Sequence, residues 1–211
     1  MFCVVKLVRK QPLFRLPKTR HSLEIYFEGT FPMMTIGHST LTLEAFLRAL
    51  KENGSTTLVD VRRYPGSKSY PHFGQAGLFA ALGHAGIRPL WREGLGGRRP
   101  VEKGSVNAGW HNEGFRGYAD YMQTPHFANE IGWLMALADF DTSVVMCAEA
   151  VPWRCHRSLI GDAVLARGGV VDDIFVQRDG QSSRRPHVMT SFARVDGDRV
   201  WYPEEGELFS R

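Results

Sequence analysis

Short apolar runs alternate with helical patterns along most of the chain, and this alternation constrains the fold most strongly. Met34–Gly37 is a short apolar run, and the apolar residues from Leu43 to Leu50 are spaced i, i+3, i+4 and i+7. After Gly54, residues 57–62 form a second run typical of a buried strand. Strand, helix and strand with short connections form the βαβ unit of a parallel sheet. The sequence therefore predicts an α/β fold.

The same kinds of pattern continue toward the carboxyl terminus. They predict strands at residues 87–91, 143–147 and 170–176, and helices at 78–82, 115–122, 125–138 and 159–164. Residues 64–77 and 94–100 are rich in glycine and proline and are predicted to be loops. Alternating residues around Asp196-Gly197-Asp198 predict a β-hairpin near the carboxyl terminus.

The net charge of +4 comes entirely from the first 33 residues. This segment carries six basic and two acidic residues, and the rest of the chain carries equal numbers of each. The rest therefore has no global attraction for nucleic acid, and any anion site must be local. We interpret residues 1–33 as a basic extension outside the fold, either disordered or the product of a misassigned start, with a transit peptide as a third interpretation.

Composition also limits the cellular setting. No apolar run approaches the roughly 20 residues that a membrane-spanning helix needs, so the sequence predicts no membrane partner. Three cysteines, Cys3, Cys147 and Cys155, do not make a disulfide framework. We therefore expect a reducing, cytoplasmic setting.

Polar residues follow three of the predicted strands. They are His38 and Ser39 after the first, Asp60, Arg62 and Arg63 at the end of the second, and Cys147, Glu149, Arg154, Cys155, His156 and Arg157 after the fourth. In an open parallel sheet the carboxyl ends of the strands share one edge, and ligands bind in the crevice there. The sequence therefore predicts that these distant residues meet in one pocket.

Several of these residues also have a purely structural interpretation. Asp60 could serve only to hold a neighbouring loop or to pair with an arginine, because buried carboxylates need partners. Cys147 could be ordinary core packing, since free cysteine is among the most buried residue types. The aromatic residues Tyr64, Tyr70 and Phe73 fit a packed lid better than a stacking platform.

Several ordered motifs together resemble a known family. TIGHST, LVDVRRYPGSKSYPHF, the LGG after a predicted strand and MCAEAVPWRCHRSLI resemble domain-of-unknown-function family 488 (DUF488) over roughly residues 34–176. The resemblance implies a Rossmann-like core and no particular reaction. The predicted fold class is thus a single Rossmann-like α/β domain, residues 34–211, with a mostly parallel sheet, flanking helices and a carboxyl-terminal β-hairpin.

The leading functional hypothesis is an enzyme, a hydrolase or transferase, that acts on a small anionic metabolite or nucleotide. Glu149 or Asp60 would be the base, with His38 or His156 as its partner. The candidate catalytic residues are Glu149, His38, Asp60, Cys147 and His156. The candidate substrate-binding residues are Ser39, Arg62, Arg63, Ser67, Arg154, Cys155 and Arg157.

Two other classes of function stay open. One is a non-catalytic module that binds a ligand or nucleic acid through the same arginines. The other is a thiol redox pair of Cys147 and Cys155, or a zinc site formed by these cysteines with His156 and His38. The spacing matches no recognised metal motif, so no metal is assigned, and the sequence identifies no cofactor.

Overall fold

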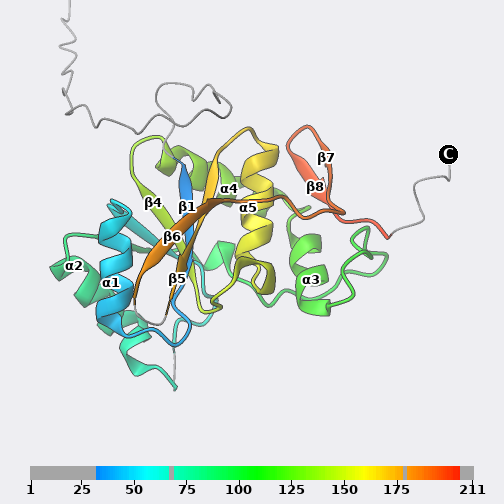
Figure 1. Ribbon diagram of the computed structural model, residues 1–211. Coiled ribbons are helices and arrows are strands. Elements are labelled where there is room, and N and C mark those ends of the chain that lie inside the picture. Colours follow the sequence, from blue (N-terminus) through cyan, green and yellow to red (C-terminus); the bar gives the residue numbers. More distant parts are fainter. Residues whose placement is uncertain (1–31, 67–68, 178–179, 205–211) are drawn as a thin grey trace, which may run out of the picture.

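A six-stranded sheet forms the centre of the fold (Figure 1). The computed structural model describes residues 32–66, 69–177 and 180–204. The strands are β1 (Met33–Gly37), β2 (Thr57–Asp60), β3 (Arg88–Trp91), β4 (Ser143–Cys147), β5 (Val171–Val176) and β6 (Ser182–Pro186). Their order is β3-β2-β4-β1-β5-β6, and all pairs are parallel except β5 with β6.

Within the described residues, five α-helices connect these strands. They are α1 (Leu43–Glu52), α2 (Gln75–His84), α3 (Glu113–Tyr121), α4 (Pro125–Ala138) and α5 (Arg157–Ala166). Short 3-10 turns lie at Pro71–Phe73, Glu93–Leu95 and Pro152–Arg154. The Thr42 and Thr124 side chains cap α1 and α4, because each hydroxyl accepts a hydrogen bond from the backbone amide three residues later. Pro125 fits the first position of α4, where no amide proton is needed.

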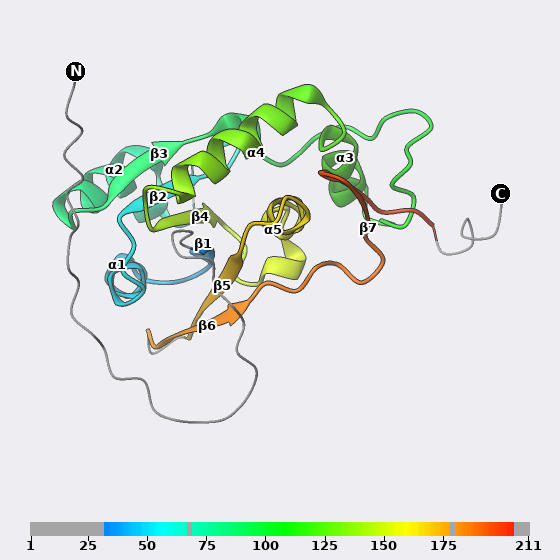
Figure 2. The same cartoon turned by 90° about the horizontal axis from the view of Figure 1, so that it is seen from above.

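Helices cover both faces of the sheet. Successive side chains of a strand point to opposite faces, so Val144 and Met146 join one core with α1 and α2. Val145 and Cys147 join the other core, with residues of α3, α4 and α5. The view from above separates α1 and α2 from α3 and α5 across the sheet (Figure 2). The central strands β1, β2 and β4 are therefore buried on both sides, which explains their nearly continuous apolar runs.

The connections from the two central strands leave in opposite directions. From β1 the chain passes through α1 to β2, on one side, whereas from β4 it passes through α5 to β5, on the other. Because β1 and β4 are neighbours, a crevice is expected between their carboxyl ends. This is the topological switch point at which open α/β sheets bind ligands.

The observed architecture confirms the predicted fold class: a mostly parallel sheet, flanking helices and a carboxyl-terminal hairpin of β7 (Arg194–Asp196) and β8 (Arg199–Trp201). β1 begins at Met33, one residue before the predicted start. The antiparallel edge strand β6 was not predicted. The basic extension was interpreted as residues 1–33. Residues 1–31 lie outside the described part of the chain, whereas Met33 is buried and belongs to β1. Within the described ranges, no helix has the length and apolar character required to cross a bilayer.

Candidate functional site

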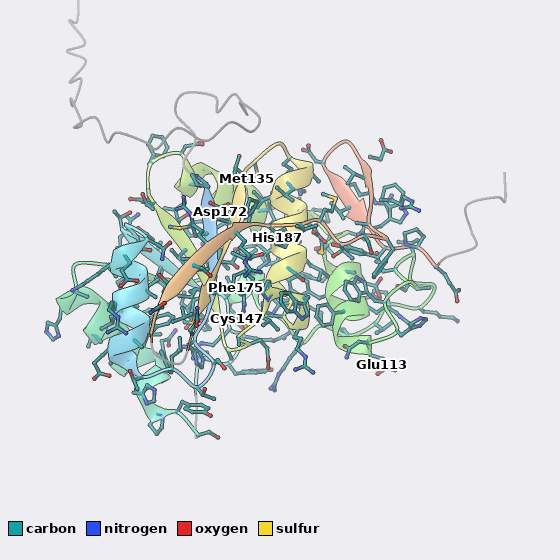
Figure 3. The ribbon with its side chains drawn as sticks, viewed as in Figure 1. Glu113, Met135, Cys147, Asp172, Phe175 and His187 are labelled. Carbon is teal, nitrogen blue, oxygen red and sulfur yellow. The ribbon has the colours of Figure 1, made fainter. Side chains whose placement is uncertain are left out.

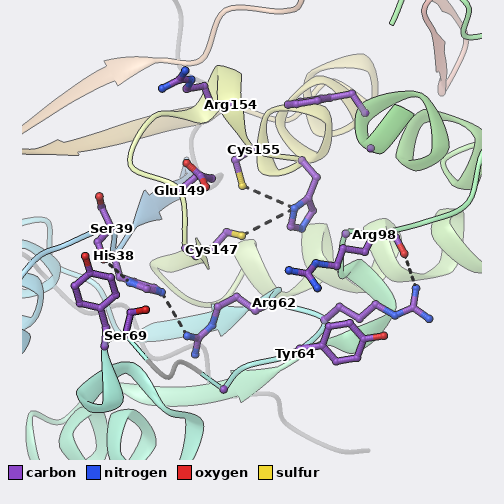
Figure 4. Close-up of a pocket in the computed structure, with 18 of the residues that line it drawn as sticks. His38, Ser39, Arg62, Tyr64, Ser69, Arg98, Cys147, Glu149, Arg154 and Cys155 are labelled. Carbon is purple, nitrogen blue, oxygen red and sulfur yellow. Dashed lines mark hydrogen bonds between the residues drawn. The ribbon is translucent and has the colours of Figure 1, made fainter. Parts of the chain in front are cut away.

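The turns after β1, β2 and β4 lie side by side at the carboxyl edge of the sheet. The backbone amide of His38 donates to the Cys147 carbonyl oxygen at 3.1 Å, and that of Ser39 donates to the Ala148 carbonyl oxygen at 2.8 Å. A pocket of about 670 Å³ opens where these turns meet. It lies at the switch point between β1 and β4, and we call it the carboxyl-edge pocket (Figure 4).

Most of the predicted site residues line this pocket. They are His38, Ser39, Arg62, Arg63, Cys147, Glu149, Arg154, Cys155 and His156. Asp60 and Arg157 are fully buried and do not belong to its lining. Ser67 lies outside the described residues. The structure thus brings together nine residues from three separate turns of the sequence.

Asp60 and Arg62 form a buried ion pair directly after β2. Both carboxylate oxygens of Asp60 accept from the Arg62 guanidinium, the shortest N···O distance being 2.7 Å, and Asp60 also accepts from the Arg62 amide. The same guanidinium donates to the Phe73 carbonyl oxygen at 2.8 Å. The ion pair therefore holds the loop that carries Phe73 against the carboxyl edge of the sheet. Both oxygens of the Asp60 carboxylate accept hydrogen bonds in this arrangement.

Arg157 holds the turn that follows β4. Its guanidinium donates to the carbonyl oxygen of Glu149 and, at 2.8 Å, to that of Ala150. Gly37 packs against the same turn so closely that an added Cβ would overlap the Glu149 carbonyl oxygen. Arg157 is fully buried. It therefore acts on the pocket through the shape of this turn.

His38 is a buried, neutral imidazole in the wall of the pocket. Burial, followed by the positive charge of Arg62, lowers the pKa of His38 to about 4. Its Nδ1 lies 3.1 Å from the Ser39 carbonyl oxygen, and its Nε2 lies 3.4 Å from the Arg62 guanidinium. The ring also stacks on Phe73 at 4.2 Å between centroids. These contacts fix its orientation.

Two thiols and one imidazole meet in another part of the wall. The Nδ1 of His156 lies 3.9 Å from the Cys147 sulfur and 3.8 Å from the Cys155 sulfur (Figure 4). A hydrogen bond between the thiols, together with burial, raises the pKa of Cys147. The same bond lowers the pKa of Cys155 against the effect of burial, assisted by His156 and Arg157. Cys155 is therefore the thiol that more readily becomes a thiolate.

The glycine-rich loop before α3 completes the pocket, although no role was predicted for it from the sequence. A Cβ at Gly97 would lie 2.9 Å from His156 Nδ1, so glycine leaves room for the imidazole. The next residue, Arg98, lines the pocket, and its carbonyl oxygen accepts from the Arg63 guanidinium at 3.0 Å. Both guanidinium groups lie over the Tyr64 ring, within 6 Å of its centroid. In the sequence, the run Gly96-Gly97-Arg98-Arg99 is the signal that could have identified this loop as part of the site.

Backbone strain is also concentrated at this pocket. Among the described residues other than glycine, Ser39 and Arg98 have positive φ angles, of 43° and 57°. Both residues line the pocket: Ser39 lies in the turn after β1, and Arg98 lies in the loop between β3 and α3. This conformation is uncommon for residues with a side chain, and such strain gathers at functional sites.

The charge of the pocket is positive although the chain beyond residue 33 is neutral overall. Four arginines line the pocket, against Glu149 as the single carboxylate of its described lining. Arg62 is neutralised by Asp60, which leaves Arg63, Arg98 and Arg154. Within the described ranges, no carboxylate forms an ion pair with any of these three. The pocket can therefore accept an anion with more than one negative charge.

Comparison with known proteins gives a match to a family model. Residues 42–164 match a family described as "Domain of unknown function DUF488". The match includes the turns after β2 and β4 and excludes His38 and Ser39. It is shorter at both ends than the resemblance over residues 34–176. Searches of curated proteins and of solved structures each found no match.

Proposed function

The chain belongs to the DUF488 family, and from this premise we propose that it is an enzyme acting on a small anionic metabolite or nucleotide in the carboxyl-edge pocket. The reaction would be a hydrolysis or a group transfer. One observation carries the proposal: three guanidinium groups without a carboxylate partner in the described structure line the same pocket as a single carboxylate, at the topological switch point.

Arginine suits the binding half of this function. Its planar guanidinium binds phosphate and carboxylate groups through paired, charge-assisted hydrogen bonds. Arg63 and Arg98 come from the loops after β2 and β3, and Arg154 from the turn after β4. They can therefore approach an anion from different sides. The aromatic rings of Tyr64, Tyr70 and Phe115 in the lining offer apolar surface for a base or a sugar.

Glu149 is the residue best placed to act as the base. It is exposed in the pocket, and no ion pair of the described residues involves it. A general base needs a free lone pair within reach of the substrate. Asp60 does not reach the pocket, because it is fully buried outside the lining, and Arg62 binds both of its oxygens. We therefore assign the proton transfer to Glu149 and a positioning role to Asp60.

Glu149→Gln tests the catalytic half of the proposal. The natural protein is first incubated with small phosphate esters, ribonucleoside mono- and diphosphates and small carboxylates, and products are identified by mass spectrometry. For a substrate found in this way, we expect Glu149→Gln to lower turnover by about 100-fold or more. The dissociation constant of the variant for this substrate should change little, because the amide of glutamine keeps the shape of the carboxylate. Calorimetric titration measures that constant.

Two results would count against this assignment. Equal turnover by the natural protein and by Glu149→Gln would remove Glu149 from the chemistry. Tight binding without any product would make the protein a binding module. If binding then requires a nucleic acid and weakens steeply with added salt, the bound partner is a polyanion and not a metabolite.

A further inference from the structure

We propose that Cys147, Cys155 and His156 form a binding site for one zinc ion, with the fourth coordination position open to the carboxyl-edge pocket. Their ligand atoms, the two sulfurs and the imidazole Nδ1, all lie within 4.8 Å of one another. All three residues line the pocket. This inference concerns metal binding alone, so it does not depend on the reaction proposed above.

The observed distances are close to those that zinc requires. With Zn–S near 2.3 Å and Zn–N near 2.0 Å, a tetrahedral ion separates sulfur from nitrogen by about 3.5 Å. The two sulfur–nitrogen distances here are 3.9 and 3.8 Å. The two sulfurs lie within 4.8 Å of each other, and a tetrahedral zinc ion separates two sulfurs by about 3.8 Å. The side chains therefore have to move by about 1 Å or less to close the site on the ion.

The fold explains why the three ligands converge although their spacing matches no metal motif. Cys147 ends β4, and its side chain points to the sheet face that α5 covers. The 3-10 turn Pro152–Arg154 then reverses the chain, and the Cys155 amide donates to the Pro152 carbonyl oxygen at 2.8 Å. Cys155 and His156 thus arrive beside Cys147 just before α5 begins at Arg157.

The donor set favours zinc over other common ions. Thiolate and imidazole are soft or borderline ligands, which suit zinc, whereas calcium and magnesium prefer oxygen. Two thiolates and a neutral imidazole also balance the charge of a divalent ion. Both thiols are free of disulfide bonds in the structure. Three protein ligands with an open fourth position are typical of catalytic zinc sites rather than structural ones.

His38, the other histidine of the pocket wall, is not part of this cluster. Its imidazole contacts the Ser39 carbonyl oxygen and the Arg62 guanidinium, and the cluster found among the described residues contains only the two cysteines and His156. Of the four ligands considered from the sequence, three therefore converge. A water molecule or a substrate atom would take the fourth position.

Metal content and cobalt substitution test the proposal. The full chain, expressed in zinc-supplemented medium and purified without a histidine tag or chelator, should contain about one zinc ion per molecule by elemental analysis. Replacing zinc by cobalt should give a thiolate-to-cobalt charge-transfer band in the near ultraviolet and intense visible bands of a tetrahedral ion. Cys155→Ser and His156→Gln should each lose the metal and the tetrahedral spectrum.

The controls separate loss of a ligand from loss of the fold. Glu149→Gln changes the same pocket without removing a ligand and should keep the metal. Circular dichroism establishes that each variant is folded. The proposal is wrong if the reduced natural protein gives no charge-transfer band with cobalt, or if folded Cys155→Ser keeps its metal. Isolation of a metal-free Cys147–Cys155 disulfide that does not bind cobalt after reduction would also overturn it.

Discussion

Replacing Gly37 by alanine is expected to destabilise the protein by roughly 3 kcal/mol or more, the upper range for overpacking a buried site. Gly37 is the last residue of β1 and pairs with Cys147 of β4. An added Cβ would overlap the Glu149 carbonyl oxygen and lie 2.9 Å from the Arg157 guanidinium. Neither group can move freely, because Arg157 is fully buried and binds that same carbonyl oxygen.

Urea unfolding of Gly37→Ala measures the effect, and Gly132→Ala is its matched control. Gly132 lies inside α4 with nothing within 4 Å of an added Cβ. Alanine is the better helix former, so this change should stabilise the protein by about 1 kcal/mol. The two substitutions are chemically identical and are expected to act in opposite directions. A Gly37→Ala variant as stable as the natural protein would contradict this prediction, because it would show that the turn after β4 moves away from the added Cβ at little cost in free energy.

His187 is expected to make the stability of the protein depend on pH. Its Nδ1 lies 2.8 Å from the Asp173 carboxylate and its Nε2 lies 3.2 Å from that of Asp162. Burial alone would lower the pKa of His187, but the hydrogen bonds and charges of these two carboxylates outweigh burial and raise it to about 9. His187 lies apart from Cys147 in the molecule (Figure 3).

The direction of the effect follows from this raised pKa. The folded protein binds the proton more tightly than the unfolded chain, whose histidine has a pKa of about 6.5. The stabilisation is therefore complete below about pH 6.5 and is lost as the pH rises through 9. A difference of between two and three pKa units corresponds to about 3 kcal/mol.

His187→Gln isolates this contribution. At about pH 6 the variant should be less stable by about 3 kcal/mol or more, since it leaves two buried carboxylates without their cation. The difference between the variant and the natural protein should shrink by about 3 kcal/mol as the pH rises past 9. Urea unfolding across this range measures both values. His111→Gln, at an exposed position, should show no such trend. A pH-independent gap for His187→Gln would refute the account.

The hydrogen bonds around His187 also explain how the carboxyl-terminal segment is attached. Asp173 accepts from the Thr35 hydroxyl of β1, and Asp162 of α5 accepts from the Tyr202 hydroxyl at 2.8 Å. His187 and Tyr202 lie beyond the segment that matches the family. No short motif marked them in the sequence, because the network joins residues that are far apart along the chain.

The fold was largely predictable because its signals are local. The apolar spacing from Leu43 to Leu50, the Thr124-Pro125 start of α4 and the run Ser143–Cys147 each identify an element without tertiary information. Strand β6 was missed because Ser182–Pro186 is polar and mostly exposed. Its pairing with β5 at the sheet edge, and not its own pattern, makes it a strand.

The site was predictable only in outline. Parallel topology indicated which turns would meet, yet the pairing of Asp60 with Arg62 and the burial of Arg157 depend on side-chain geometry. Arg98 was missed because its loop follows β3, whose carboxyl end was not among the three considered. The convergence of Cys147 with His156 depends on the reversal of the chain at Pro152–Arg154.

The central claim is that the carboxyl-edge pocket binds an anion, and calorimetric titration of arginine variants tests it most directly. The probe is the phosphate ester or nucleotide that binds the natural protein most tightly. We predict that Arg98→Gln and Arg154→Gln each weaken binding by roughly tenfold or more. Arg88→Gln removes the same charge at the amino end of β3 and should leave the dissociation constant unchanged. Equal affinities for all four proteins would contradict the claim.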